Sequence, residues 1–420
     1  MFNSEKPTML KSRPPLPARF RFLNVVGRFL QAVNPPLTRF DEETVCKAAM
    51  KQTGLADFGD PHYREGLLRV LESAEDDANL HFIGRLATRD VVISSLASRL
   101  LLMEARKRTP DVFQRPLVPP IIILGLPRSG TTLLHRLLAA DPMHRAVPLW
   151  ELLRPLPTGS SVNGSPDPRR QLVEQRLNSR LKLAPDLDRK HYVRADTPEE
   201  CMWLLAATFV SVVFWVVAPV YGYLDWYSRQ DSVKTYQEYY WLLQVLQAVD
   251  PTRRLTLKAP AHTGALAALL QTIPNALLIQ THRNPVTVCN SLNSLFCSLH
   301  GSVTERLDLP RMAEANIRLL ENDIALNLAT RDAYPNTVFD VYYGQLVADP
   351  VGTIKGIYDH FGLAWSDVYE QRLHAHVREN PKEKYGRHRY ASGNFGQTDA
   401  AIAKRFVIYS ERFGFKNTGD

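Results

Sequence analysis

The sequence predicts an α/β fold, in which a parallel β-sheet is flanked by helices and preceded by an N-terminal helical extension. Four short apolar runs, each ending in polar residues, are followed by segments with helical spacing, as in repeated β-α units. The runs are residues 121–126, 254–258, 276–283 and 337–343. Ligands of such sheets bind beyond the carboxyl ends of the strands, so we expect the site at Arg128, Lys258, Arg283 and Tyr343.

The first part of the chain has helical periodicity and no strand signal. Apolar residues recur at helical spacing from about residue 40 to residue 108, as in the run VVISSLASRLLLMEARKR. Prolines 110, 116, 119 and 120 then mark a boundary. The sequence therefore predicts a helical extension over 1–115 and an α/β domain over 116–415.

Composition and charge restrict the class of protein. The 420 residues are 45% hydrophobic, and 51 Lys and Arg against 43 Asp and Glu give a net charge of +8. This excludes a mostly disordered chain and falls short of the basic surface of a nucleic-acid binder. The four cysteines form no C-x-x-C pair, which indicates neither a disulfide framework nor a metal site and favours a cytoplasmic location.

The N-terminal segment is basic but lacks the apolar core of a secretory signal. Seven Lys or Arg stand against Glu5 alone up to Arg39. A solvated tail is the favoured interpretation, and peripheral contact with an anionic membrane surface is the alternative.

Residues 201–224 carry no charged side chain and are long enough to span a bilayer. Their flanks, Glu199, Glu200 and Asp225, show no Lys or Arg bias, and Pro219 and Gly222 interrupt the far end. We therefore expect a buried helix, which either belongs to the core alone or lines a pocket for an apolar substrate.

The stretch GLPRSGTTLLHR (125–136) has the two glycines and the hydroxyl pair of a phosphate-binding P-loop, but Thr131 replaces the lysine. A strand, a glycine turn and a helix opening at Gly130 aim the backbone N–H groups of 129–132 at one point, which favours an anion. Arg128 supplies the positive charge, and no strand ends in an Asp that could hold magnesium. The loop is typical of a phosphate ligand bound without a metal.

The segment LPRSGTTLLHRLLAADP resembles the 5′-phosphosulfate loop of sulfotransferases that use 3′-phosphoadenosine 5′-phosphosulfate (PAPS), with an arginine as in the tyrosylprotein branch. The later segment LKAPAHTGALAALLQTIPNALLIQTHRNPVTVCNSL resembles the family's second signature, whose Arg and Ser clamp the 3′-phosphate. Those residues correspond to Arg283 and Ser291. The segments YYGQLVADP, IYDHFGL and NPKEKYGRHRYASGNFG resemble landmarks of the bacterial branch, so the likeness covers roughly 116–415.

The resemblance implies transfer of a sulfuryl group from PAPS to an acceptor hydroxyl without a metal. It implies that the donor is bound by Arg128, Ser129, Gly130, Thr131, Thr132, Arg283, Ser291, Tyr343, Lys384 and Arg387. Arg128 and Lys258 would stabilise the charge of the transition state. The base that takes the hydroxyl proton is either Glu151 or His262, and Glu151 is favoured.

Three functions remain to be distinguished from the sequence. A P-loop kinase or NTPase requires the missing lysine and magnesium. A non-catalytic nucleotide-binding scaffold is expected to lack Arg128, Lys258 or both base candidates, and all are present. A sulfotransferase agrees with every motif. The aromatic residues of 201–224 favour a hydrophobic small-molecule or lipid acceptor, although core packing explains them equally well.

Overall fold

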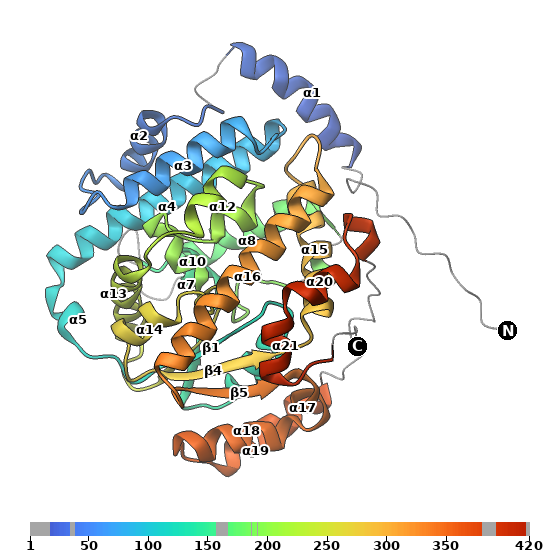
Figure 1. The fold of residues 1–420 in the computed structure, drawn as a ribbon. Coiled ribbons are helices and arrows are strands. Elements are labelled where there is room, and N and C mark those ends of the chain that lie inside the picture. Colours follow the sequence, from blue (N-terminus) through green and yellow to red (C-terminus); the bar gives the residue numbers. More distant parts are fainter. Residues whose placement is uncertain are drawn as a thin grey trace.

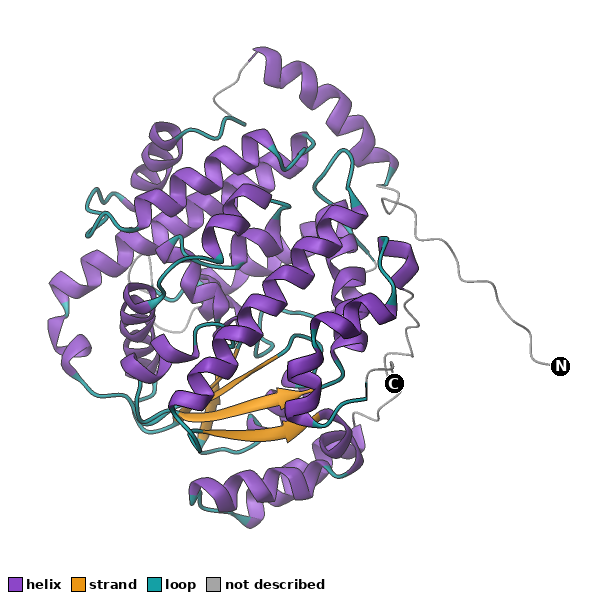
Figure 2. Cartoon of the chain, viewed as in Figure 1, coloured by secondary structure: helices purple, strands orange, loops and turns teal. Residues whose placement is uncertain are grey.

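The protein is described by a computed structural model that covers residues 17–33, 38–156, 167–185, 187–190, 192–379 and 392–416. Within these ranges five strands form one parallel sheet in the order β2-β3-β1-β4-β5. The strands are drawn in orange in Figure 2. Their bounds are β1 Ile121–Gly125, β2 His144–Ala146, β3 Arg254–Lys258, β4 Leu277–His282 and β5 Val338–Tyr342. The predicted α/β class is confirmed, and β1 is the central strand.

Alternate side chains of β1 enter two different layers. Ile121 and Ile123 pack against the helices below the sheet in Figure 1, in a core with Leu134 and Ile354. The helices labelled there are α17 (Tyr343–Ala348), α18 (Pro350–Phe361) and α19 (Asp367–Glu379), and α6 (Thr131–Leu138) contributes to the same core. Ile122 belongs to a larger core on the opposite face. This alternation is expected of a strand that is buried on both faces.

The opposite face is covered by a thick helical layer, which lies above the sheet in Figure 1. The longer helices here are α13 (Val233–Val249), α14 (Leu266–Thr272), α15 (Pro285–Gly301) and α16 (Leu309–Ala333), with α8 (Pro168–Leu183), α20 (Asp399–Arg405) and α21 (Val407–Phe413). Shorter elements connect them: α5 (Pro110–Gln114), α7 (Leu149–Leu153), α9 (Leu187–Lys190), η3 (Pro260–His262) and η4 (Ser392–Phe395).

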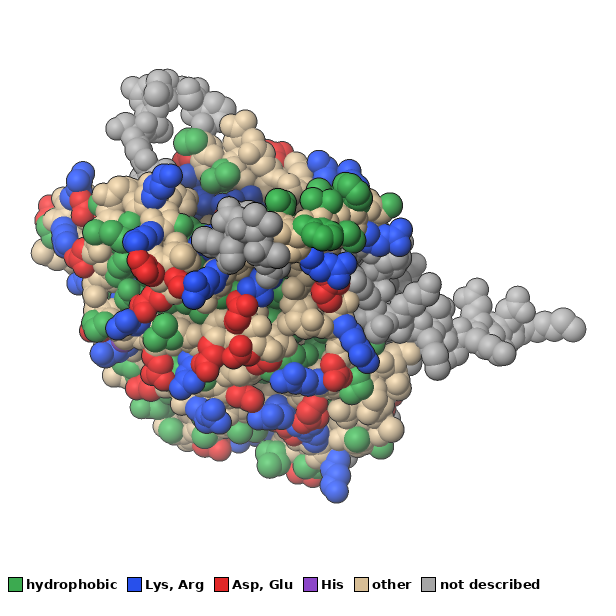
Figure 3. Space-filling model, turned by 90° about the horizontal axis from the view of Figure 1, so that it is seen from above, with side chains coloured by type: hydrophobic (Ala, Val, Ile, Leu, Met, Phe, Trp, Pro, Cys, Tyr) green, Lys and Arg blue, Asp and Glu red, His purple; other side chains and the backbone are tan. Residues whose placement is uncertain are grey.

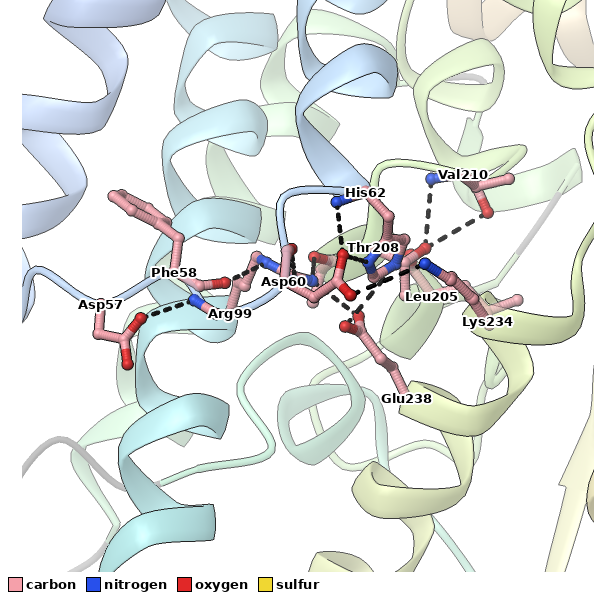
Figure 4. A network of polar contacts seen from close by, with 12 residues as sticks. Asp57, Phe58, Asp60, His62, Arg99, Leu205, Thr208, Val210, Lys234 and Glu238 are labelled. Atoms are coloured by element: carbon pink, nitrogen blue, oxygen red, sulfur yellow. Dashed lines mark hydrogen bonds and ion pairs between the residues drawn. The ribbon is translucent and has the colours of Figure 1, made fainter.

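The N-terminal helices share their core with this layer. They are α1 (Ala18–Val33), α2 (Glu42–Thr53), α3 (Tyr63–Asp76) and α4 (Phe82–Arg108). The buried Arg99 of α4 donates hydrogen bonds to the carbonyl oxygens of Phe58 and Asp60 at 2.7 and 2.8 Å, and to the Glu238 carboxylate of α13 at 2.7 Å (Figure 4). The helical extension is thus joined to the rest of the chain by a buried ion pair, and the boundary at 115/116 stays a prediction.

The charge-free stretch 201–224 is not one helix, so that expectation is wrong. It forms α10 (Met202–Leu205), η2 (Ala206–Thr208), α11 (Val213–Val217) and the first turn of α12 (Tyr221–Tyr227). Phe209 is left-handed at φ 59°, and Ala218, which precedes Pro219, is extended, as sterics before a proline require. No helix in the described ranges has the length and apolar character needed to cross a membrane.

Candidate active site

The loop between β1 and α6 depends on two glycines. Gly125 has φ 121°, and a Cβ there would lie 2.3 Å from the carbonyl oxygen of Thr281 on β4. Gly130 has φ 94°, and its Cβ would lie 2.9 Å from Cδ2 of Tyr343. Gly125 N also donates to Thr263 Oγ1 at 2.9 Å. Side chains at either glycine would strain the backbone and displace a neighbour, so the loop is held tightly against β4 and α17.

Residues from three predicted motifs meet at this loop. Arg283, just after β4, donates from Nη1 to the carbonyl oxygen of Arg128 at 3.0 Å, and its guanidinium lies 4.2 Å from the centre of the Tyr343 ring. Arg128, left-handed at φ 65°, donates from Nε to Ser291 Oγ on α15 at 3.1 Å. The structure therefore brings together Arg128, Ser291, Arg283 and Tyr343.

This arrangement suits an anion. The first N–H groups of α6 have no acceptor within the helix, and Gly130, Thr131 and Thr132 line a cavity at its N-terminus. Arg283 Nε is buried and has no hydrogen-bond partner within the described chain. Ser129 has a different place: its hydroxyl bonds the Leu126 carbonyl and the Thr281 hydroxyl, so its side chain braces the turn.

Lys258 ends β3, next to β1, and is fully buried. Its Nζ lies 2.9 Å from Glu200 Oε1 and 3.5 Å from Glu199 Oε1. Burial favours a lower pKa for Lys258, but the charges of Glu200 and Glu199 outweigh it and raise the pKa above its usual value. Lys258 is therefore a cation, and both of its carboxylate partners line the cavity.

Glu151 and His262 are both engaged elsewhere. Glu151 on α7 forms a buried ion pair with Arg145 of β2, whose Nη1 donates to the Leu246 carbonyl at 3.1 Å. His262 bonds the Tyr236 hydroxyl at 2.6 Å and Cys201 Sγ at 3.2 Å. Burial lowers the pKa of His262 to about 3, so the ring is neutral. The structure does not bring either side chain to Arg128.

The cavity beside the phosphate loop has a volume of about 890 Å³. Its wall includes helix α4 of the extension, α8, the broken segment 201–224, α15 and α16. Apolar side chains dominate this wall, among them Leu86, Ala87, Leu177, Trp203, Val216, Leu295 and Phe296. Trp203 and Val216 thus line the cavity, whereas Phe209, Phe214 and Trp215 are core residues.

Acidic residues that line the cavity were missed by sequence reasoning, among them Glu199, Glu200 and Asp323. Glu199 and Glu200 precede the apolar stretch 201–224, and a pair of carboxylates at that position is a signal from which they could have been found. Asp323 on α16 also lines the cavity, and burial raises its pKa to about 8. Its Oδ1 lies 2.3 Å from the point where a Cβ of Gly264 would stand. No sequence pattern pointed to it.

Two predicted residues cannot be placed. Lys384 and Arg387 lie outside the described residues. In the parts of the chain that are described, no group of three or more His, Cys, Asp or Glu side chains is arranged to hold a metal ion.

A loop closed by two glycines and two arginines, after the central strand of a parallel sheet, has the features of a candidate anion-binding site. Residues 119–367, more than half of the chain, match the model of the sulfotransferase family. The chain belongs to this family, of the bacterial type, and is a sulfotransferase.

Relatives and solved structures agree with this assignment. The omega-hydroxy-beta-dihydromenaquinone-9 sulfotransferase Stf3 of Mycobacterium bovis is 26% identical over 287 residues, which cover 63% of this chain and 68% of Stf3. The crystal structure of sulfotransferase STF1 from Mycobacterium tuberculosis H37Rv is 31% identical, with a TM-score of 0.76 over 88% of this chain and 98% of that one. For STF9 from Mycobacterium avium the values are 26%, 0.80, 90% and 98%.

Proposed function

We propose that this sulfotransferase moves a sulfuryl group from PAPS to the hydroxyl of a hydrophobic small-molecule or lipid acceptor. The observation that carries the proposal is the connection of two environments in one cavity. The cationic loop with Arg128 and Arg283 forms one end, and apolar side chains dominate the remaining wall. A polar donor and an apolar acceptor can meet only where such environments join.

The donor proposal is supported by the chemistry of the loop. The N–H groups at the start of α6 and the Arg128 guanidinium suit the phosphosulfate, and Arg283 Nε and Ser291 Oγ suit the 3′-phosphate. Tyr343 would contact the nucleotide. Lys384 and Arg387 keep their proposed contact with the 3′-phosphate from the family resemblance alone.

The acceptor proposal is supported by the cavity and by Stf3, whose name gives an omega-hydroxylated menaquinone derivative as its substrate. A cavity of about 890 Å³ is in the usual range for small-molecule ligands, and an apolar wall favours a long or fused hydrocarbon. The carboxyl of Asp323 is a polar group with which an acceptor could form a hydrogen bond.

The reaction requires a base at the acceptor hydroxyl. An S–O bond forms to the acceptor oxygen, the S–O bond to the 5′-phosphate breaks, and the hydroxyl proton leaves. We propose Glu200 for this role in place of Glu151 or His262, because Glu200 lines the cavity and bonds Lys258. Lys258 would then stabilise the negative charge on the transferred group and the leaving phosphate.

The proposal is tested by incubating the protein with radiolabelled PAPS and a panel of long-chain, sterol and isoprenoid alcohols, with and without a metal chelator. We expect a labelled sulfate ester and an equal amount of 3′-phosphoadenosine 5′-phosphate (PAP) to form in both conditions. The acceptor class would be overturned if the protein binds PAP and sulfates a polar sugar or peptide but none of the apolar alcohols. Failure to bind PAP would overturn the donor.

A further inference from the structure

Helix α1 (Ala18–Val33) presents its apolar side chains to the outside. Phe22 and Phe29 are 67% and 74% exposed, and Leu23, Val25, Val26 and Leu30 are also exposed. Among residues 18–30 the buried positions are instead Asn24 and Gly27. A helix that only covers a core shows the opposite distribution, with its apolar stripe facing inward.

The attachment of α1 is small and specific. Asn24 Oδ1 accepts a hydrogen bond from the backbone N–H of Ile83 at 3.0 Å, at the start of α4. At Gly27 a Cβ would lie only 2.1 Å from the Phe82 ring, so the backbone of α1 rests on that ring. The face toward α4 is therefore shaped for close approach, which leaves the large apolar residues on the far side.

The charged residues of α1 indicate what kind of surface its apolar face binds. Arg19, Arg21 and Arg28 lie on the helix, and it contains no Asp or Glu. Arg21 and Arg28 are two turns apart and therefore lie on one side of the Phe22 and Phe29 face. Figure 3 looks down on this part of the molecule and shows hydrophobic side chains gathered between Lys and Arg side chains. A second copy of α1 would bring like charges together.

We propose that α1 is an interfacial helix that binds the surface of an anionic phospholipid bilayer. Phe22 and Phe29 enter the boundary between headgroups and acyl chains, and Arg21 and Arg28 contact the lipid phosphates. Ile83, which bonds Asn24, also lines the apolar cavity, so the bound helix places this end of the cavity beside the bilayer.

Co-sedimentation with vesicles tests this inference. Wild-type protein is expected to sediment with phosphatidylcholine–phosphatidylglycerol vesicles, more weakly with phosphatidylcholine alone, and less as the salt concentration rises. The double variant Phe22→Ser, Phe29→Ser is expected to bind about tenfold more weakly or worse. The variant Phe22→Leu, Phe29→Leu is expected to retain most binding, which separates hydrophobicity from folding. Arg21→Gln with Arg28→Gln is expected to weaken binding about threefold to tenfold on the anionic vesicles only.

Ile408→Ser provides the matched control, because Ile408 is 69% exposed on α21. It is expected to bind as wild type does. The inference would be overturned if wild-type protein does not bind the vesicles, if the Phe-to-Ser variant binds them as well as wild type does, or if binding does not depend on anionic lipid. It would also be overturned by a dimer in solution that the Phe-to-Ser variant converts to a monomer, because α1 would then bind a second copy. The inference does not depend on the proposed reaction. The thermal shift on adding PAP is measured for each variant and is expected to equal that of wild type, so a loss of vesicle binding can be told apart from a failure of the donor site.

Discussion

Arg283 donates a hydrogen bond to the backbone carbonyl oxygen of Arg128 at 3.0 Å, across 155 positions of sequence. The side chain proposed to bind one phosphate of the donor thus also fixes the loop proposed to bind the other. Donor binding and loop geometry are expected to respond together to changes at this contact.

Arg283→Met should raise the Kd of PAP by about tenfold to a hundredfold, because it removes a charge-assisted contact and the bond to Arg128. Isothermal titration calorimetry measures this directly. The matched control is Arg311→Met, since Arg311 also lies over a tyrosine ring, that of Tyr221 at 3.8 Å, but lines a different hollow of the surface. Equal affinities of the Arg283 variant and wild type would contradict the donor assignment.

Gly130→Ala should lower the free energy of unfolding by about 1–2 kcal/mol and weaken PAP binding, because its φ of 94° and its contact with Tyr343 leave no room for a methyl group. Gly344→Ala, where a Cβ meets nothing within 4 Å, is the control and should change neither quantity. Urea unfolding and calorimetry check both variants. Normal PAP binding by Gly130→Ala would show that the loop does not need this geometry.

Glu200→Gln should lower kcat by about two to four orders of magnitude while PAP affinity stays within a few-fold, because the proton acceptor is removed whereas Lys258 keeps Glu199 as a charged partner. Glu151→Gln should instead lower stability by about 1–3 kcal/mol, because its buried partner Arg145 loses a charged acceptor. Single-turnover kinetics and urea unfolding separate the two effects. A large loss of kcat in a stable Glu151→Gln protein would return the base to Glu151, and the same result for His262→Gln would assign it to His262.

Ala87→Trp should reduce kcat/KM for long apolar acceptors by about tenfold or more while PAP binding stays unchanged, because Ala87 of α4 lines the apolar part of the cavity. Short-chain alcohols should be affected less. Steady-state kinetics over a series of chain lengths measures the difference. A uniform loss at every length would indicate general damage instead of a filled pocket.

Stability should be greatest near pH 6.5. Burial lowers the pKa of His262 to about 3, and it lowers those of His135 and His300 to about 4 and about 3, all from 6.5. Below pH 6.5 the unfolded chain takes up these protons first, so stability is lost as the pH falls, by at most about 1.4 kcal/mol per pH unit for each group. Burial raises the pKa of Asp323 from 3.8 to about 8, so the contribution of this carboxyl to stability changes with pH in the opposite direction. It is lost as the pH rises from 3.8 to about 8.

Asp323→Asn tests the alkaline side of this profile. It removes the titrating group, so the decline between pH 6.5 and pH 8 should become shallower than in wild type. Urea unfolding across the pH range measures both slopes. Identical profiles would mean that Asp323 is ionised in the folded protein.

The strands and the donor loop could be predicted because their signals are local. β3 has the predicted bounds, and β1, β4 and β5 differ from the predicted runs by at most one residue at either end. The turn of the donor loop could be predicted because Gly125 and Gly130 are glycines, which adopt the positive φ angles that the turn requires. β2 was missed, because His144–Ala146 is only three residues long and has no apolar alternation.

The partners of acidic side chains could not be predicted, since they depend on tertiary contacts. Nothing in the sequence indicates that Glu151 pairs with Arg145, or that Glu200 meets Lys258 from 58 positions away. The break at Phe209 was missed for a related reason, because a left-handed phenylalanine contradicts its own preference and is stabilised by surrounding packing.

Helix α4 contacts α1 at its first turn and contributes residues such as Leu86 and Ser94 to the cavity wall further along. One helix therefore runs from the outer surface along the wall of the cavity. Substitutions on α4 can change which acceptor alcohol binds without changing the residues proposed to bind the donor. New acceptor preferences could therefore evolve on this helix while β1 and its loop stay the same.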